Sequence, residues 1–168
     1  MGRDADPLAI CDYNTTWAKQ FIDLSARIVG SLQKIVLRME HVGSTAVPGL
    51  AAKPIIDMDV VLASSSDLPQ AIRLLADLGY VHEGDLGVSG REAFRCPSGA
   101  ARHHLYVLTE GAPELHRHIA FRDALRADAA LRDEYAQLKR LLAAQYPDDR
   151  KAYTQGKSTF IKAVIRAI

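Results

Sequence analysis

The sequence predicts an α+β fold, in which a small mixed β-sheet is flanked by helices and followed by a helical C-terminal third. Three observations lead to this prediction. An amphipathic helical pattern comes first, strand-like runs follow between residues 34 and 108, and helix-forming residues dominate after Pro113. Because the chain has 168 residues and neither a repeat nor a low-complexity linker divides it, we expect residues 1–168 to form one domain.

The first helix is expected over residues 15–31, with Asn14-Thr15 as its N-cap. Its apolar residues recur at steps of three or four, which places them on one helix face. They are Trp17, Phe21, Leu24, Ile28 and Leu32. The segment KIVLRMEHV, residues 34–42, is rich in β-branched and apolar residues and predicts the first strand.

PIIDMDVVLA predicts the second strand, over residues 55–63, and its apolar run suits an interior strand covered by helices. A loop over residues 64–67 then leads into a helix over residues 68–78, which Gly79 ends. Three short strands are expected at residues 80–83, 92–95 and 103–108, separated by the segments GDLGVSG and PSGAA. The pattern does not determine the order of the strands in the sheet.

The C-terminal third predicts three helices, over residues 115–128, 129–146 and 152–168. The middle one carries an apolar stripe at helical spacing, made of Leu131, Tyr135, Leu138, Leu142 and Tyr146. Pro147 with the two aspartates after it marks the break before the last helix.

The bulk composition restricts the class of function. The net charge is +1, so no overall field attracts nucleic acid or membranes, and any anion site must be local. No apolar run approaches the length of a membrane span, and the first residues lack the apolar stretch of a signal peptide, so we expect a cytoplasmic location. Cys11 and Cys96 lie far apart, which favours two reduced cysteines over a disulfide or a metal cluster.

Candidate chemistry is concentrated in HVGSTAVPGLAAKPIIDMD, residues 41–59. Asp57 and Asp59 share one face of the predicted strand, and Met58 lies on the other. Two carboxylates this close repel each other unless a cation or a proton relieves them. We therefore expect a metal site for Mg²⁺, or Mn²⁺ in its place, completed by substrate phosphates. The alternative is an exposed strand with two solvated acids.

The segment Gly43-Ser44-Thr45 follows the first strand and is the candidate phosphate site. Glycine lets the backbone approach a ligand closely, and hydroxyl and backbone N–H groups at such a turn can bind phosphate oxygens. Lys53, just before the acidic strand, would neutralise phosphate or carboxylate charge. The alternatives are an ordinary capped turn and a surface lysine.

The stretch EHVGSTAVPGLAAKPIIDMDV resembles the signature of the GrpB family, an uncharacterised family of the nucleotidyltransferase-like, polymerase-β-like fold. The resemblance extends over nearly the whole chain, through Tyr13, Trp17, Gly79-Tyr80, HHLYV, FRDALR, EYAQLK and YTQGKSTFI. It implies that Gly43 and Ser44 contact phosphate and that Asp57 and Asp59 hold metal. Family members also occur fused to a dephospho-CoA kinase domain.

The resemblance implies transfer of a nucleotidyl group from a nucleoside triphosphate to an unknown small-molecule or protein acceptor. In the wider superfamily a third carboxylate on a later strand activates the acceptor, but the strand HHLYVL carries no acid. His104 and Tyr106 share one face there, and His104 is either the catalytic base or a structural histidine. The alternative function is a non-catalytic module that binds a nucleotide, a CoA-like metabolite or another anion. A metal-dependent hydrolase has no support beyond the aspartates.

Arg91 and Arg95 share a strand face, and Arg95 is a candidate contact for anionic substrate. Lys157 lies one helical turn after Tyr153, and the resemblance makes it a further candidate. Arg122 and Lys139 are expected on solvated helix surfaces.

Three histidines complete the set of polar candidates. His116 and His118 are separated by about 200° around a helix, so they form a poor metal pair. His41, beside the glycine turn, is the better site candidate.

Overall fold

The computed structural model describes residues 9–168 and confirms the expected α+β class and order of elements. Most predicted boundaries agree within one or two residues. The first strand begins two residues later than expected, because residues 33–35 form a 3₁₀ turn. The elements are α1 (Thr16–Leu32), β1 (Val36–Val42), β2 (Ile56–Leu62), α2 (Leu68–Asp77), β3 (Val81–Gly84), β4 (Arg91–Arg95), β5 (His103–Thr109), α3 (Pro113–Ala127), α4 (Ala129–Gln145) and α5 (Arg150–Arg166). The predicted single domain also includes residues 1–8, which lie outside the described residues.

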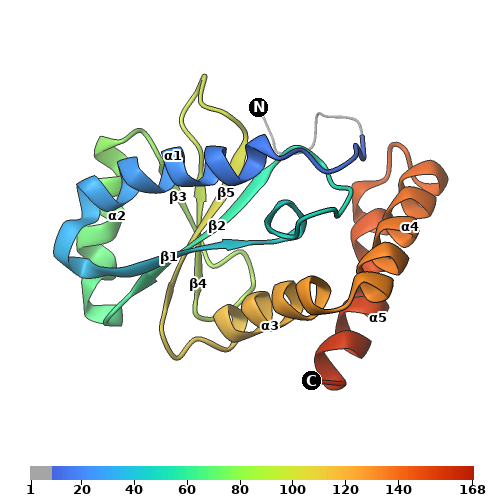
Figure 1. Cartoon of the computed structure of the whole chain (residues 1–168). Coiled ribbons are helices and arrows are strands. Elements are labelled where there is room, and N and C mark those ends of the chain that lie inside the picture. The colour runs from blue at the N-terminus through green and yellow to red at the C-terminus, as the bar shows by residue number, and fades with distance from the viewer. Residues whose placement is uncertain (1–8) are drawn as a thin grey trace.

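The five strands form one mixed sheet in the order β1-β2-β5-β4-β3 (Figure 1). Strands β2 and β5 are parallel, and the other neighbouring pairs are antiparallel. Strand β2 is therefore an interior strand, as its apolar sequence predicts. The register places Asp57 opposite His104 and Asp59 opposite Tyr106, so two distant segments of the chain meet here.

One face of the sheet is apolar and is covered by α1 and α2. The predicted stripe of α1 packs into this core, where Trp17, Ile28 and Leu32 are buried. Met58 and Leu105 point to the same side, as strand alternation requires. At the start of α1, Asn14 Oδ1 accepts a hydrogen bond from the backbone N–H of Thr16 at 2.9 Å.

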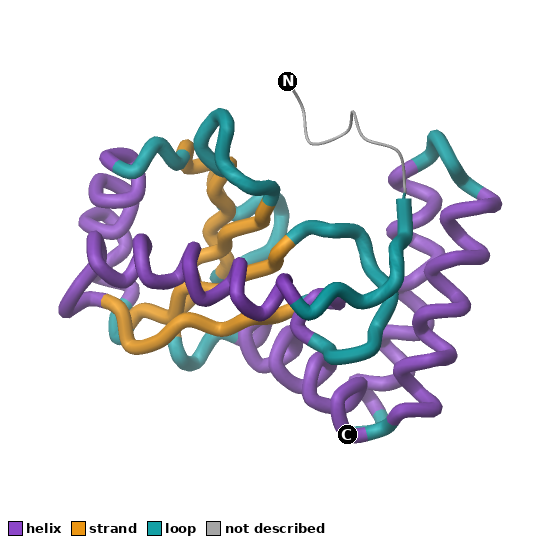
Figure 2. The backbone as a smooth tube through the Cα atoms, turned by 45° about the horizontal axis from the view of Figure 1, so that its top comes forward, coloured by secondary structure: helices purple, strands orange, loops and turns teal. Residues whose placement is uncertain are grey.

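The opposite face is only partly covered, because α3 packs over one end of the sheet. Helices α4 and α5 lie beyond the sheet, and the loop from residue 43 to residue 55 runs between them and the strands (Figure 2). Val47 and Leu50 anchor this loop in an apolar cluster with Leu125 and Tyr135. The predicted break before the last helix is confirmed, and Asp149 Oδ1 accepts from the N–H of Ala152 at 2.9 Å.

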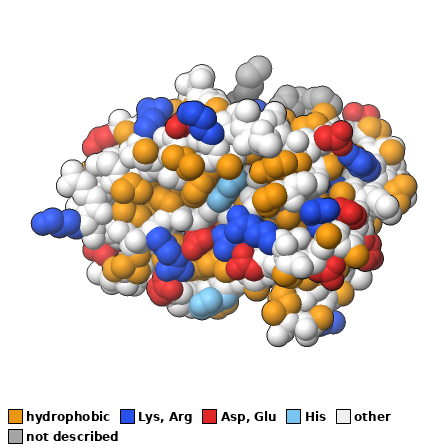
Figure 3. Space-filling view, viewed as in Figure 1, with side chains coloured by type: hydrophobic (Ala, Val, Ile, Leu, Met, Phe, Trp, Pro, Cys, Tyr) orange, Lys and Arg blue, Asp and Glu red, His pale blue; other side chains and the backbone are white. Residues whose placement is uncertain are grey.

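The surface carries charges of both signs. On the face shown in Figure 3, Lys and Arg side chains are interspersed with Asp and Glu, in keeping with the net charge of +1. Among residues 9–168, no helix has the length and the apolar character needed to cross a membrane.

Candidate functional site

The two aspartates of β2 share a face, as predicted, and the elements around them give them different surroundings. Asp57 lines an open pocket of about 350 Å³ between the sheet, the loop after β1 and helices α4 and α5. Its Oδ1 accepts a hydrogen bond from His104 Nδ1 at 2.7 Å. Asp59 is fully buried and does not line that pocket.

Gly43 fits the predicted close approach, and the group that it approaches is the Asp57 carboxylate. Its φ of +71° lies in the left-handed region, which favours glycine. A Cβ at this position would lie 2.3 Å from Asp57 Oδ2. Both the backbone angle and the space therefore require a glycine where the loop leaves β1.

Cationic side chains from α3 and α4 hold the backbone of the loop. Each donates to a carbonyl oxygen of the segment from residue 41 to residue 51, and together they fix the position of Ser44. The contacts are Arg122 to His41 O (3.0 Å), Arg126 to Ala46 O (2.7 Å), Arg132 to Pro48 O (3.4 Å) and Lys139 to Ala51 O.

The prediction that Arg122 and Lys139 are solvated is wrong, because only 9 % and 2 % of these residues is exposed. Tertiary packing turns both helices toward the loop. Lys139 Nζ also donates to Ser44 Oγ at 2.9 Å, and Arg122 also donates to Glu40 Oε2 at 2.7 Å.

The pocket beside Asp57 is strongly basic. Lys53, Lys139, Lys157 and Arg150 line it, and Asp57 is the one acid among its described lining residues. Lys53 and Lys157 lie against the Tyr153 ring, with their Nζ atoms 4.7 and 4.4 Å from its centroid.

Burial and neighbouring positive charges lower the pKa of the lysines that line the pocket. Burial and the charge of Lys157 lower the pKa of Lys139 to about 7. Burial and the charge of Lys53 lower the pKa of Lys157 to about 8. Burial also lowers the pKa of Lys53. Since desolvation and mutual repulsion both oppose these charges, a polyanion in the pocket would relieve them.

Asp59 has a partner that the sequence reasoning missed. His118 Nδ1 donates to Asp59 Oδ2 at 2.7 Å, and His118 Nε2 lies 3.2 Å from Glu114 Oε1. Burial raises the pKa of Asp59. Burial lowers the pKa of His118, but the contacts with Asp59 and Glu114 outweigh it, so that the pKa is raised. The four-residue spacing of Glu114 and His118 was the available signal, since it places both on one face of α3.

Asp57 and Asp59 are the two carboxylates at the site that could hold a magnesium ion together with a substrate phosphate. Asp59 Oδ1 is buried and has no hydrogen-bond partner among the described residues. Mg²⁺ commonly takes one or two protein carboxylates and completes its octahedron with water and phosphate oxygens. The described part of the chain holds no group of three or more His, Cys, Asp or Glu side chains suited to a metal, so an all-protein cage is not the fitting arrangement.

The structure brings most of the predicted site residues to the same pocket. Its lining includes Ser44, Thr45, Lys53, Asp57, His104 and Lys157. Thr45 also secures the loop, because its Oγ1 lies 3.4 Å from Ile55 O and 3.0 Å from His41 Nε2. Arg95 lies elsewhere, in a second pocket of about 520 Å³ that shares Ile55 and His104 with the first.

The ranking of His41 above His118 is reversed by the structure. His41 pairs with Met58 in the register, so it faces α1 and stacks on Phe21 with ring centroids 4.6 Å apart. Burial lowers the pKa of His41 to about 4. His116 is exposed, and only His118 of the two α3 histidines reaches an aspartate.

Comparison with known proteins identifies close relatives over most of the chain. The family profile described as GrpB protein matches residues 7–167. The UPF0157 protein YqkA of Bacillus subtilis is 38 % identical over 150 residues, which cover 89 % of this chain and 44 % of YqkA. A UPF0157 protein of Streptomyces coelicolor is 36 % identical over 163 residues, 97 % of this chain and 85 % of the relative. This chain thus spans less than half the length of YqkA.

Solved structures of other proteins also resemble this chain. The crystal structure of conserved protein GrpB from Enterococcus faecalis matches with a TM-score of 0.86 and 33 % identity, over 95 % of this chain and 96 % of that one. The Cid1 poly(U) polymerase with MgGTP bound matches with a TM-score of 0.54 and 15 % identity, over 78 % and 45 % of the two chains, which shows a shared nucleotidyltransferase-like fold alone. From profile, relatives and fold together, the chain belongs to the GrpB protein family.

Proposed function

We propose that the protein binds a nucleoside triphosphate with Mg²⁺ and transfers the nucleotidyl group to an acceptor that carries a hydroxyl. The observation that carries this proposal is the basic pocket, in which Lys53, Lys139 and Lys157 line the same cavity as Asp57. Lys139 is buried, and desolvation lowers the pKa of all three lysines, so their charges are disfavoured in the empty protein and a polyphosphate relieves this cost. A monoanion would leave most of that charge uncompensated.

Each polar side chain of the pocket has a role in the proposed binding of the triphosphate and magnesium. The Ser44 hydroxyl and the ammonium groups of Lys53, Lys139 and Lys157 bind phosphate oxygens. Asp57 and Asp59 would hold the magnesium ion, which supplies charge neutralisation at the phosphates. Catalysis then rests on positioning and electrostatics, without a covalent enzyme intermediate.

The transfer step balances without a further reagent. The acceptor hydroxyl oxygen attacks the α-phosphorus and forms the new O–P bond, while the bond to the bridging oxygen breaks and pyrophosphate leaves. His104 takes the place of the missing third carboxylate. In a neutral ring, the tautomer that donates Nδ1–H to Asp57 leaves the lone pair on Nε2, which can receive the hydroxyl proton.

A non-catalytic binding module of the same fold is the second candidate. Strand β5 offers no carboxylate, and Asp59 is closed off by His118. A protein named dephospho-CoA kinase from Mycolicibacterium paratuberculosis is 24 % identical over 95 % of this chain and 46 % of its own length. This relative favours a nucleotide or CoA-like ligand for the alternative.

The test combines binding with turnover. Each nucleoside triphosphate is titrated with Mg²⁺ or Mn²⁺ by calorimetry, and pyrophosphate release is followed in mixtures of acceptors. We expect binding by the wild type and loss of pyrophosphate release in Asp57→Asn and Asp59→Asn, with Asp77→Asn, an exposed acid on α2, as the control. Binding without release in every acceptor mixture would favour the binding module. Absence of nucleotide binding would contradict both.

A further inference from the structure

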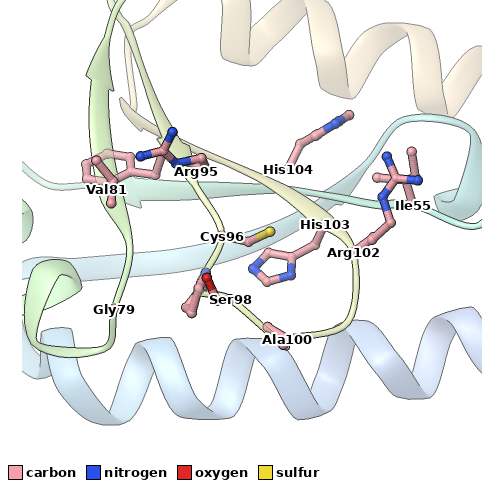
Figure 4. A pocket seen from close by; sticks show the side chains of 13 residues that line it. Ile55, Gly79, Val81, Arg95, Cys96, Ser98, Ala100, Arg102, His103 and His104 are labelled. Atoms are coloured by element: carbon pink, nitrogen blue, oxygen red, sulfur yellow. The ribbon is translucent and has the colours of Figure 1, made fainter. Parts of the chain in front are cut away.

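The larger pocket, of about 520 Å³, has no role in the proposed binding of the triphosphate. It lies between the ends of β3 and β4, the loop from Cys96 to Arg102 and the start of β5 (Figure 4). Its volume falls in the range of small-molecule sites, which is about 300–1,000 Å³.

The two pockets adjoin each other at His104. Both pockets are lined by His104 and Ile55, so the imidazole that contacts Asp57 also forms part of the larger pocket. In the view of Figure 4, Arg95 and Arg102 lie on either side of the His104 side chain. A molecule in the larger pocket would therefore reach the group that adjoins the phosphate-binding pocket.

The lining of the larger pocket selects for charge. Arg95 and Arg102 contribute two guanidinium groups, and Ser98 contributes a hydroxyl. Within residues 9–168, no Asp or Glu side chain lines it. Guanidinium groups bind carboxylate and phosphate oxygens with paired N–H donors, and they disfavour a cationic ligand.

The loop from Cys96 to Arg102 lines the pocket with short side chains. Its residues Pro97, Ser98, Gly99 and Ala100 have short side chains and form a turn closed by the Ala100 N–H to Pro97 O hydrogen bond at 3.3 Å. Phe94 and Val81 add apolar surface on the opposite strands. The volume of about 520 Å³ suits a compact metabolite better than an extended chain.

We propose that this larger pocket is the acceptor site and that it binds a small anionic molecule with a free hydroxyl, such as a phosphorylated polyol. Arg95 binds the anionic group, which directs the hydroxyl toward His104 and the neighbouring phosphate-binding pocket. Arg95 is thus a residue for acceptor recognition, in place of its predicted role with the triphosphate. This inference rests on the proposed function for the identity of the reaction, while the binding site itself can be tested without nucleotide.

The experiment is a titration of the isotopically labelled protein, followed by amide chemical shifts in solution. Glycerol 3-phosphate is the probe. Glycerol is the control without charge, and choline is the control that carries a hydroxyl and a positive charge. Uridine and a short oligouridylate test whether the larger pocket binds a nucleoside or RNA instead. The reporters are the amides of Ser98, Gly99 and Arg102 for the larger pocket and those of Ser44 and Thr154 for the smaller one.

We expect saturable shifts from glycerol 3-phosphate at the larger-pocket amides, and at least tenfold weaker binding of glycerol and choline. Arg95→Gln should weaken glycerol 3-phosphate at least tenfold and leave the triphosphate affinity within twofold. Arg73→Gln, at an exposed site on α2 that lines neither pocket, should change neither.

Shifts confined to the smaller pocket, or equal binding by Arg95→Gln and wild type, would overturn the proposal. Tighter binding of uridine or oligouridylate than of glycerol 3-phosphate at the larger pocket would also overturn it, because the site would then take a nucleoside or RNA. If the protein does not bind the triphosphate but the larger pocket still selects the anionic probe, the proposed function is contradicted and the anion site is not.

Discussion

The two faces of the central strands β2 and β5 differ in what they do for the molecule. On one face, Met58 and Leu105 are buried among apolar side chains of α1 and α2. On the other face, one residue away in each strand, Asp57 and His104 form a hydrogen bond at the edge of a basic pocket. The alternation of a strand thus separates a face that stabilises the fold from a face that holds charge.

The difference shows where the stability of the protein comes from. Burial of apolar surface favours folding, whereas buried charges such as Lys139 and Asp59 oppose it unless they are paired. The basic pocket around Asp57 therefore depends for its stability on the apolar face of the same strands. Changes to the two faces should have separable effects on unfolding and on ligand binding.

A substitution on the apolar face should reduce the stability most. Leu75 on α2 is fully buried in the core, and Leu75→Ala should lower the free energy of unfolding by roughly 2–5 kcal/mol through lost burial and a cavity. Urea unfolding measures this loss. Leu141→Ala on α4, where the side chain is largely exposed, should change it by less than about 0.5 kcal/mol. The folded fraction of Leu75→Ala should still bind the triphosphate, and loss of that binding would contradict the separation of the two faces.

Gly43→Ala tests the contact between the loop and the polar face. The new Cβ would meet Asp57 Oδ2 at 2.3 Å in a left-handed backbone, so we expect a cost of about 1–3 kcal/mol and displacement of the carboxylate. Triphosphate and Mg²⁺ binding should fall with it in calorimetric titrations.

Gly84→Ala is the matched control for that variant. Gly84 has a similar φ of +74°, but nothing lies within 4 Å of an added Cβ. Gly84→Ala should therefore lower the free energy of unfolding through its strained backbone, but it should bind the triphosphate and Mg²⁺ like the wild type. Equal binding by the two variants would show that the Gly43–Asp57 contact has no part in the site.

Lys139→Met removes the buried cation that joins the loop to the pocket. Lys139 donates to Ser44 Oγ and to Ala51 O, so the variant loses both a phosphate contact and a constraint on Ser44. We expect at least tenfold weaker binding of inorganic tripolyphosphate, about 1.4 kcal/mol. Lys151→Met, at an exposed position on α5, should bind like the wild type. Unchanged affinity in Lys139→Met would remove this lysine from the proposed site.

A pH dependence with opposite signs for stability and binding is also expected. The pKa of Lys139 is about 7 in the folded protein and 10.5 ordinarily, so the unfolded chain binds more protons above pH 7. Lys139 alone should therefore raise the stability between about pH 7 and pH 10.5, by up to roughly 1.4 kcal/mol per pH unit. Tripolyphosphate affinity should fall over the same window, as Lys139 and Lys157, which face Lys53, Arg150 and Asp57, lose their protons.

Urea unfolding and calorimetry at three pH values measure the two trends. Lys139→Gln should flatten the rise in stability, because the titrating group with the lower pKa is gone. A stability and an affinity that both stay constant would show that these lysines keep their charge throughout the window.

The position of each element follows from local pattern, which is why most of the fold could be predicted. The spacing of Trp17, Ile28 and Leu32 requires one buried helix face, and the alternation through Asp57, Met58 and Asp59 requires two carboxylates on one side of a strand. The loop with Gly43 and Ser44 was recognisable because its backbone needs are local as well. These features depend on residues within a few positions of one another.

Local sequence patterns specify the elements, the shared face of the aspartates and the resemblance to the GrpB family. The docking of helices and strands specifies which side chains meet at the site. The strand order brings His104 to Asp57, the packing of α3 brings His118 to Asp59, and α4 turns Lys139 inward. These contacts join residues 47, 59 and 95 positions apart, whereas the periodicity of a helix or strand relates only residues a few positions apart.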